Sequence, residues 1–341
     1  MAMHFEPQDE SELEEWLSRP PPGVAEALAG LDGDVLVLGA GGKMGPTLAR
    51  MARRALPADR QVLAVSRFSS AAAARQLADH GVQTLACDLL DRAALERLPD
   101  AANVVFMAGQ KFGSSEDPGL TWRMNAVLPA LVAERYAGAR TVVFSTGCVY
   151  PFVPVESGGA REDCPLDPPG EYAYSCIARE RLFAEASRRL GTPCLMFRLN
   201  YAIDLRYGVL HDIARKVWTG EPVDVTCGYV NVIWQGDACA RALQCLAHTS
   251  TPPAILNVTG RETLAVRALA ERLGALLDRS PQFTGQEAPT AWLADAGQSI
   301  AWFGEPTVGL DRMLEATAAW IRRGGASLGK PTHFESRDGR F

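Results

Sequence analysis

Short apolar runs alternate with segments of helical periodicity between residues 34 and 198. The apolar runs are residues 34–38, 61–65, 82–86, 103–108, 141–145 and 194–198. The first segment of helical periodicity ends at residue 56. Four others span residues 71–80, 92–98, 122–136 and 172–190. Strands that are apolar on both faces and separated by helices indicate a parallel sheet covered on both sides. Because such crossovers are right-handed, the pattern predicts a doubly wound α/β fold of the Rossmann type.

The same pattern divides the chain into regions. After residue 198 the strand-helix rhythm loosens, which indicates a smaller substrate-binding region, and the last residues are polar with two aromatics. That tail either docks on the body or is disordered. The predicted regions are an N-terminal helical extension (1–30), a dinucleotide-binding domain (31–198, with elements returning at 226–250), a substrate-binding region (199–225 and 251–325) and a C-terminal tail (326–341).

Composition narrows the class of protein. The net charge of -6 provides no basic field, so it gives no support for a nucleic-acid partner. The apolar runs have the length of strands and are too short to span a bilayer, and the first ten residues lack the features of a secretory signal. Eight cysteines are scattered without a CxxC pair, which favours a reducing cytoplasm and no metal site.

A glycine-rich loop follows the first apolar run and opens the first helix: Gly39-Ala-Gly-Gly-Lys-Met-Gly45. Glycine permits the tight turn and the close approach of a pyrophosphate to backbone N–H groups at a helix N-terminus. The alternative is a tight turn without a ligand. The position of the loop at the first strand-helix junction favours a nicotinamide dinucleotide held by Gly39, Gly42, Lys43, Met44 and Gly45.

Residues at the ends of the second and third runs bear on the type of cofactor. An acidic residue after the second strand would hold the 2′-hydroxyl of NAD, whereas basic residues accommodate the 2′-phosphate of NADP. Ser66 and Arg67 stand there, and Lys43 lies in the glycine loop, so we predict NADP in preference to NAD. The alternative is that both cations are solvated surface charges. Asp88 either accepts a hydrogen bond from the adenine or caps the next helix.

Several motifs together resemble the extended short-chain dehydrogenase/reductase family, of the epimerase and dehydratase type. They cover residues 34 to 245 in family order. The motifs are Gly39-x-x-Gly42-x-x-Gly45, Asp88-Leu89, Phe144-Ser-Thr-Gly-Cys-Val-Tyr-Pro151, Tyr172-Ala-Tyr-Ser175 with Glu180, Arg198-Leu-Asn200, and Asp237 after Val230-Asn-Val-Ile233. The resemblance implies a bound nicotinamide dinucleotide, with Leu89, Ala108, Gly109 and Tyr172 among its contacts.

The resemblance also implies catalytic roles. Thr146 matches the residue that orients the substrate oxygen, and Tyr172 matches the acid/base tyrosine. A phenol of pKa about 10 must be brought towards neutrality to exchange a proton. The family does so with a lysine four residues further on, which also holds the nicotinamide ribose, but here that residue is Cys176. Three interpretations remain open: another cation such as Lys111 or Arg179 substitutes, the chemistry has changed and involves Cys176, or the cofactor is bound without turnover.

Polar side chains near the ends of the fourth and sixth runs are candidates for substrate binding. They are Lys111, Asn125, Asn200 and Arg206. A lone His211 in the following segment is more often structural. We therefore expect an NAD(P)-dependent epimerase, dehydratase or oxidoreductase that acts on a sugar, sugar acid or nucleotide sugar. The alternatives are a regulator of the same fold with impaired catalysis, or a lyase or isomerase with altered chemistry. The resemblance implies a homodimer paired through helices 122–137 and 172–190.

Overall fold

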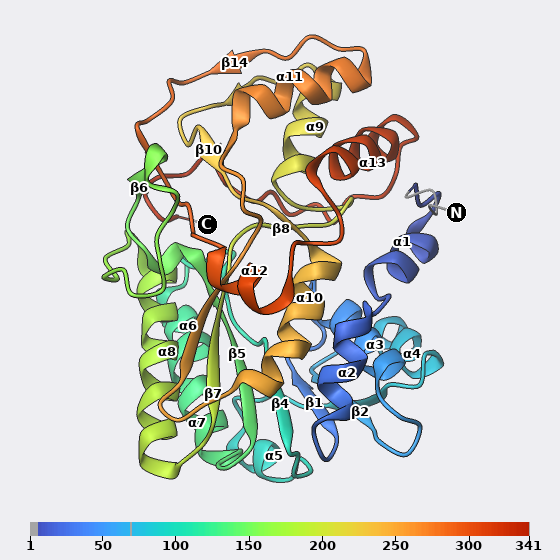
Figure 1. Ribbon diagram of the computed structural model, residues 1–341, viewed down its shortest axis with the longest axis vertical. Helices are drawn as coiled ribbons and strands as arrows, with labels where there is room; N and C mark the ends of the chain where they lie inside the picture. The colour runs from blue at the N-terminus through green and yellow to red at the C-terminus, as the bar shows by residue number, and fades with distance from the viewer. Residues whose placement is uncertain (1–5, 69, 341) are drawn as a thin grey trace.

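The computed structural model describes residues 6–68 and 70–340. Its centre is a seven-stranded sheet with strand order β12-β7-β5-β4-β1-β2-β3 (Figure 1). All pairings within this sheet are parallel. The predicted doubly wound α/β fold is therefore confirmed. The strands are β1 (Val35–Leu38), β2 (Val62–Ser66), β3 (Gln83–Ala86), β4 (Asn103–Phe106), β5 (Arg140–Thr146), β7 (Cys194–Leu199) and β12 (Ala254–Val258).

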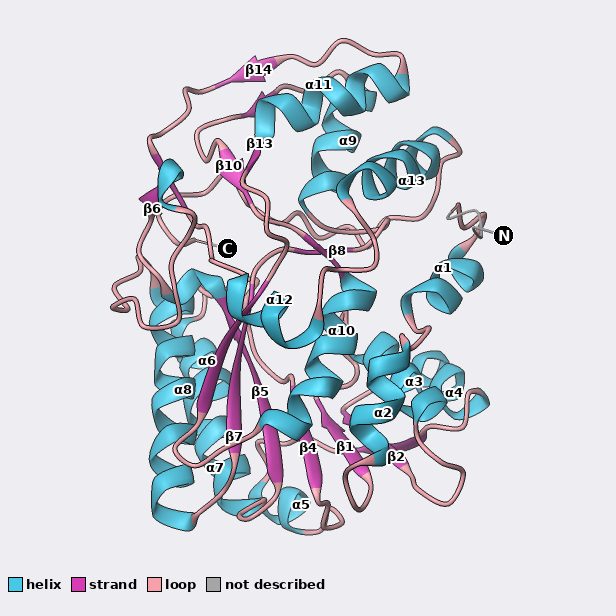
Figure 2. Cartoon of the chain, viewed as in Figure 1, coloured by secondary structure: helices cyan, strands magenta, loops and turns pink. Residues whose placement is uncertain are grey.

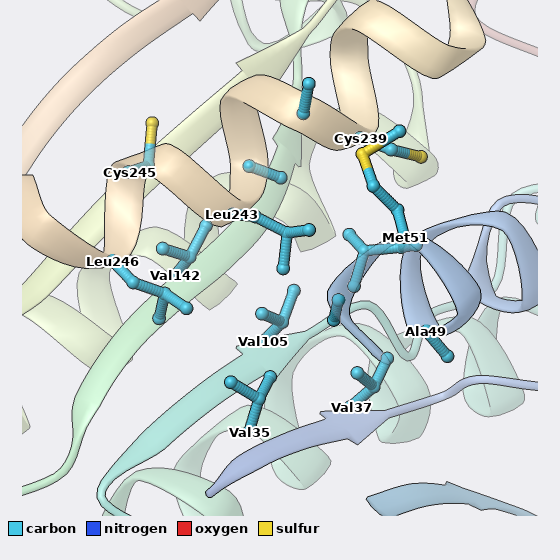
Figure 3. Close-up of a cluster of buried hydrophobic side chains, with 14 of the residues drawn as sticks. Val35, Val37, Ala49, Met51, Val105, Val142, Cys239, Leu243, Cys245 and Leu246 are labelled. Atoms are coloured by element: carbon cyan, nitrogen blue, oxygen red, sulfur yellow. The ribbon is translucent and has the colours of Figure 1, made fainter. Parts of the chain in front are cut away.

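Helices cover both faces of this sheet (Figure 2). One layer is formed by α2 (Pro22–Ala29), α3 (Gly45–Ala55), α4 (Ala71–Asp79) and α10 (Gln235–Gln244), and the other by α5 (Arg92–Glu96), α7 (Leu128–Arg135) and α8 (Glu171–Leu190). Along β1, Val35 and Val37 face the first layer, whereas Leu36 and Leu38 face the second. Figure 3 shows Val35 and Val37 beside side chains of α3 and α10. This double burial explains why the strand sequence is apolar at every position.

Strand β12 lies within the range predicted for the substrate-binding region, yet it extends the central sheet. It pairs with β7, so that Ala254 lies opposite Leu195 and Val258 opposite Leu199. The strand is partly exposed at its first two residues and carries the polar Asn257, whose side chain bonds to Tyr150 and to Ala160 O. A short edge strand with a polar residue lacks the continuous apolar run by which the other strands were recognised.

A second core lies beyond the carboxyl ends of the strands. It is formed by α9 (Val209–Thr219), α11 (Val266–Leu277) and α13 (Leu310–Arg322), together with α1 (Glu10–Leu17). The remaining elements are short: β6 (Val153–Pro154), β8 (Ala202–Ile203), β9 (Val223–Asp224), β10 (Tyr229–Val230), β11 (Ile233–Trp234), β13 (Leu264–Ala265), β14 (Phe283–Thr284), β15 (Thr290–Ala291), α6 (Pro118–Trp122), α12 (Gly297–Phe303), η1 (Arg123–Val127), η2 (Gly147–Val149), η3 (Val155–Ser157) and η4 (Cys245–His248).

The two ends of the chain pack on the body. Val24 and Leu28 of α2 are fully buried in the core beside the sheet, while Leu13 and Leu17 of α1 belong to the second core. In the tail, Phe334 is 1% exposed within that second core. The tail therefore docks on the body through the residues described. Over the described residues, no helix is long and apolar enough to cross a membrane.

The helix predicted over residues 122–136 is interrupted. Between α6 and α7, residues Arg123–Val127 form a π-helical turn in which Leu128 N–H donates to Arg123 O, five residues back. Pro129 follows at the start of α7 and has no N–H for the carbonyl of Asn125. A proline thus favours the wider turn, and π-helical turns are frequent at functional sites. The turn carries Asn125, whose side chain is fully buried.

Candidate functional site

A groove of about 1060 Å³ crosses the carboxyl ends of the central strands. In parallel α/β sheets ligands bind at this edge. The groove brings together most of the predicted cofactor residues, and lies between the glycine loop and the loop after β4. Its lining includes Gly39, Gly42, Lys43, Ser66, Arg67, Asp88, Leu89, Ala108, Gly109 and Lys111.

The glycine loop is built so that side chains are excluded from it. Gly39 has a φ of +91°, and a Cβ there would lie 2.6 Å from Ala108 N. A Cβ on Gly45 would lie 2.3 Å from Ala40 O, which holds the start of α3 against the loop. At Gly42, by contrast, the nearest atom would be Gly39 O at 3.3 Å. The loop and the N-terminus of α3 thus form a cradle that fits the pyrophosphate of a dinucleotide.

The outer end of the groove contains the residues predicted to select the cofactor. Ser66 ends β2 and lies below the loop, with its Oγ 2.3 Å from where a Cβ on Gly41 would be. Arg67 is exposed and lines the groove. Asp88 accepts a hydrogen bond from Leu90 N at 3.0 Å, whereas the cap of α5 is Asp91. The geometry therefore leaves Asp88 in a turn beside the groove, and the residue is not the helix cap.

A smaller cavity of about 260 Å³ continues from the inner end of the groove. It contains two of the three predicted catalytic residues, Thr146 and Tyr172, and the predicted substrate residues Lys111 and Asn200. Met44 also lines it. Thr146 ends β5, and Tyr172 lies in the first turn of α8. Because the strand end and the helix start meet here, residues 26 positions apart reach one cavity.

The electrostatics of Tyr172 are set by its neighbours. Burial raises the pKa of Tyr172 well above its ordinary value, and the thiols of Cys176 and Cys148 raise it further. The guanidinium of Arg179 and a hydrogen bond with Thr146 act in the opposite direction. In the protein alone the phenol is therefore protonated at neutral pH.

Cys176 does not line the cavity. Its side chain is 0% exposed and packs among Val149, Tyr150 and Ile177. Burial raises the pKa of this thiol to about 11, so it is protonated at neutral pH. The thiol shares a hydrogen bond with Tyr172, so it lies beside the tyrosine although it does not line the cavity.

A cation does approach the cavity from the same helix, two turns beyond the tyrosine. Arg179 donates to Phe144 O and to Asn125 Oδ1, each at 2.7 Å. Its NH2 atom lies 2.4 Å from the place of a Cβ on Gly109, so only glycine at position 109 admits the guanidinium. Arg179 therefore lies directly beneath the loop that follows β4.

Asn125 ties this loop to α8 rather than facing the cavity. Its amide accepts from Gln110 N and donates to Gln110 O, both at 2.8 Å, and donates to Ser175 Oγ at 2.9 Å. With the bond from Arg179, the side chain uses all of its hydrogen-bonding groups. The residue predicted as a substrate ligand thus has its polar atoms engaged within the protein.

Two lysines meet at the junction of groove and cavity. The Nζ of Lys43 lies 3.3 Å from the centroid of the Tyr207 ring. Lys111 Nζ lies 6.0 Å from the Tyr172 ring centroid and donates to Thr332 O at 3.5 Å. Burial lowers the pKa of Lys43 to about 7 and lowers that of Lys111, and the charge of Lys111 lowers that of Lys43 further.

Arg206 lies outside both spaces. It pairs with Asp204 and with Glu14 of α1, each at 2.7 Å, and so fastens the N-terminal helix to the body. His211 is buried, and its ring nitrogens bond to Leu205 O and Ser327 Oγ. Arg206 and His211 follow β7 in the chain and so lie near the site, but their side chains bond to other parts of the protein.

Sequence reasoning missed the contribution of the tail. Lys330 and Pro331 line the groove, and Thr332 lines the inner cavity, where its N–H and hydroxyl both donate to Asp212 of α9. No short-range motif marks these residues. Tyr201 and Tyr207 also line the cavity, and each is next in sequence to a predicted substrate residue, Asn200 or Arg206.

A buried ion pair supports the floor of the site. Arg198 of β7 binds Glu180 of α8 through two nitrogens, at 2.7 and 3.0 Å, with side chains 3% and 7% exposed. Ser145 donates to the same carboxylate, and Arg198 donates to the Tyr150 hydroxyl at 2.7 Å. Burial alone would lower the pKa of Arg198, yet Glu180 raises it above its ordinary value. The pair joins the strand that precedes Asn200 to the helix that carries Tyr172.

Solved structures similar to this chain include three nucleotide-sugar enzymes. UDP-glucose 4-epimerase from Thermus thermophilus, in complex with NAD, is 22% identical with a TM-score of 0.70, covering 86% of this chain and 99% of that one. UDP-glucuronic acid 4-epimerase from Bacillus cereus, with UDP-glucuronic acid and NAD, is 16% identical with a TM-score of 0.70, covering 85% and 99%. dTDP-glucose 4,6-dehydratase from Bacillus anthracis, with NAD, is 15% identical with a TM-score of 0.73, covering 86% and 97%.

The TM-scores of these three structures show that they share the fold of this chain. No curated protein matches the chain. Residues 35–204, which contain the glycine loop, Thr146 and Tyr172, match the model of the NAD dependent epimerase/dehydratase family. Residues 35–204 of the chain therefore belong to the NAD-dependent epimerase/dehydratase family.

Proposed function

We propose that this protein is an NAD(P)-dependent oxidoreductase of the epimerase or dehydratase type that acts on a sugar, a sugar acid or a nucleotide sugar. The proposal is carried by the pairing of Thr146 with Tyr172 in the cavity that continues the glycine-loop groove. The nicotinamide, when bound, supplies hydride transfer. Thr146 then orients the reacting oxygen of the substrate, and Tyr172 exchanges the proton of that oxygen.

In this proposal Arg179 and Lys111 supply the positive charge that the family pattern places at residue 176. Arg179 lowers the pKa of Tyr172 through its charge, but its guanidinium is held by Phe144 O and Asn125. Lys111 lines both the groove and the cavity and approaches Tyr172 from the loop after β4. Arg179 thus acts on the phenol as a fixed positive charge, and Lys111 contacts the substrate.

NADP is the preferred cofactor in this proposal. Support comes from Arg67, which lines the outer end of the groove, and from Ser66, which brings no carboxylate to repel a 2′-phosphate. We expect Arg67→Ala to weaken NADPH binding while leaving NADH binding unchanged, and Ser66→Asp to shift the preference towards NADH. Titration of nicotinamide fluorescence measures both. Equal effects of Arg67→Ala on the two cofactors would refute the preference.

A second candidate is a protein of the same fold that binds the cofactor without turnover, as a regulator. It is favoured by the raised pKa of Tyr172 and by the inert, buried thiol of Cys176. The two candidates differ in one measurable respect, because only the first transfers hydride.

The deciding experiment combines cofactor binding with turnover. The protein is titrated with NADPH and NADH by fluorescence, and a panel of sugars, sugar acids and nucleotide sugars is screened for oxidation or epimerisation. Tyr172→Phe should abolish turnover and retain cofactor binding, whereas Tyr174→Phe, an exposed tyrosine on the same helix, should leave both unchanged. Cofactor binding with no turnover across the panel would favour the regulator. Turnover that survives Tyr172→Phe would disprove the assigned role.

We also propose a homodimer. Leu128, Val132 and Phe183, on the helices predicted to pair, are buried in the core of the chain. Support comes instead from a set of exposed apolar side chains on α6, the π-helical turn and α8: Leu120, Trp122, Val127 and Tyr174. These three elements pack against one another, and exposed apolar side chains that lie close together mark association surfaces. Light scattering after gel filtration should give twice the chain mass of 36.7 kDa, and Val127→Glu should give the monomer. A monomeric wild-type protein would refute the proposal.

A further inference from the structure

The cavity beside Tyr172 is small for the substrates of the similar structures. Its volume of about 260 Å³ lies below the roughly 300–1,000 Å³ of pockets that enclose drug-sized ligands. Part of that space belongs to the nicotinamide, which must lie within reach of Tyr172 for hydride transfer. What is left within the cavity itself suits a single small molecule.

The tail sets this limit on size. Thr332 lines the cavity and is held by two hydrogen bonds to Asp212, at 2.8 and 2.6 Å. Two residues further on, Phe334 is 1% exposed in the second core. Arg337 then lies 4.0 Å from the Phe152 ring centroid and donates to Thr290. Three separate contacts therefore hold the tail over the space.

Cations, rather than carboxylates, line what remains of the cavity. Lys43, Lys111 and Arg179 border it, whereas no aspartate or glutamate does among the residues that the structure describes. The guanidinium of Arg179 already donates to Phe144 O and Asn125, so the two lysines are the cations that we assign to the ligand. Asp204 and Asp212 influence Lys43 through their charge, but the described hydrogen bonds of these carboxylates go to Arg206, Gln235 and Thr332. The Lys43 ammonium instead lies over the face of Tyr207, which is an aromatic surface open to the cavity.

We propose that the substrate is a small polyhydroxylated acid without a nucleotide, a sugar acid or related hydroxy acid, whose carboxylate lies between Lys43 and Lys111. This inference rests on the proposed function and names its substrate class. Asn200 and Thr146 provide neutral hydrogen-bonding groups for the hydroxyls in the same cavity.

The lowered pKa values of the two lysines agree with this assignment. Burial and mutual repulsion disfavour two ammonium groups at one place, and a carboxylate between them offsets both effects. The cofactor pyrophosphate is a competing anion for the same side chains, because Lys43 and Lys111 also border the groove. The experiment must therefore separate the binding of the acid from that of the cofactor.

The test measures equilibrium binding by calorimetry in the full-length Tyr172→Phe protein saturated with NADP⁺, so that turnover does not interfere. The probes are D-glucuronate, D-galacturonate and D-gluconate, with D-glucose and D-galactose as neutral counterparts, glucose 6-phosphate as the phosphate arm and UDP-glucose as the nucleotide arm. At least one free acid should bind about tenfold or more tightly than its neutral counterpart and more tightly than both other arms, since a charged hydrogen bond contributes roughly this much. No preference for any acid, or tightest binding of UDP-glucose or the sugar phosphate, would overturn the inference.

Variants assign the carboxylate to the lysines. Lys43→Met and Lys111→Met should each weaken acid binding about tenfold, and change NADPH binding by less than about threefold. Lys216→Met, on α9 and outside both spaces, removes the same charge and should change neither. Equal losses for the acid and for NADPH would assign the lysines to the cofactor and refute the proposal.

Failure of the proposed function is distinguishable. If an acid binds through the lysines but the wild-type protein transfers no hydride, the chemistry is wrong and the binding site stands. If the protein turns over a nucleotide sugar and binds no free acid, the chemistry stands and the substrate class is wrong.

Discussion

The buried pair of Glu180 and Arg198 gives the sharpest test of how the site is held. Removing one partner leaves the other as a buried, unpaired charge, which costs about 3–5 kcal/mol of unfolding free energy. Here the remaining partners of the pair are the hydroxyls of Ser145 and Tyr150 and the backbone carbonyl of Glu162, and all three are neutral. We therefore expect Arg198→Met and Glu180→Met each to lower the free energy of unfolding by about 3–5 kcal/mol.

The double variant should be more stable than either single one. With both charges gone, Tyr150 still donates to Asn257 at 2.7 Å. The residual losses are the acceptor of Ser145 and the donor to the partly buried carbonyl of Glu162. An unsatisfied buried hydroxyl costs about 1–3 kcal/mol, so the double variant should lose about that much. The coupling free energy between the two positions is then at least about 3 kcal/mol.

Urea unfolding followed by fluorescence and circular dichroism measures all three variants. The matched control is the exposed pair Glu185 and Arg189 on the same helix, with nitrogen and oxygen 2.9 Å apart. Its disruption should cost less than about 1 kcal/mol, because surface pairs are weak. A loss below about 1 kcal/mol in Arg198→Met, or a double variant as unstable as the sum of the singles, would refute the reasoning.

Three further predictions concern the loop, the tail and a lysine. Gly39→Ala should lower the free energy of unfolding by about 2 kcal/mol or more in urea titrations, since φ is +91° and the Cβ would meet Ala108; Gly42→Ala, the less crowded position, should instead weaken NADPH binding and leave stability nearly unchanged. Deleting residues 329–341 should speed NADPH association several-fold in stopped-flow fluorescence, because Lys330 and Pro331 border the groove; an unchanged rate would show that the tail does not limit entry. In the cofactor-free protein, Lys43 with a pKa of about 7 binds fewer protons than in the unfolded chain, so the free energy of unfolding should rise between pH 7 and 9 by at most about 1.4 kcal/mol per pH unit. Lys43→Met should flatten that rise, and an identical slope in the variant would contradict the assignment.

The central strands could be predicted from the sequence because their information is local. Strands β1, β4 and β5 are buried on both faces, so β1 is apolar throughout and β4 and β5 each contain a continuous apolar run. The glycine loop is similarly local, since φ at Gly39 and the close approach of Ala108 require glycine whatever lies further along the chain.

What could not be predicted depends on contacts between distant residues. The tail meets the groove through bonds such as Thr332 to Asp212, which are separated by 120 residues. Arg206 was expected at the substrate, but Glu14, 192 residues away, provides its carboxylate partner. The π-helical turn had a local cause in Pro129, but the effect was to turn Asn125 inward towards Gln110 and Arg179, which only the folded arrangement reveals.

Loss of the lysine at position 176 follows from the packing around it. Cys176 is 0% exposed and packs against apolar side chains and Tyr172, so a lysine there would bury a longer, charged side chain in this cluster. The positive charge has not left the site, however, because Arg179 reaches the loop after β4 across Gly109, and Lys111 enters from that loop itself. A charge held by Phe144 O and Asn125 acts on Tyr172 at a fixed position. Lys43 and Lys111 are then not needed to lower the pKa of Tyr172. This separation of roles allows the same site to recognise an acidic substrate. Two results together would contradict the separation: a Cys176→Lys variant that gains turnover with unchanged acid binding, and an Arg179→Met variant that keeps its activity.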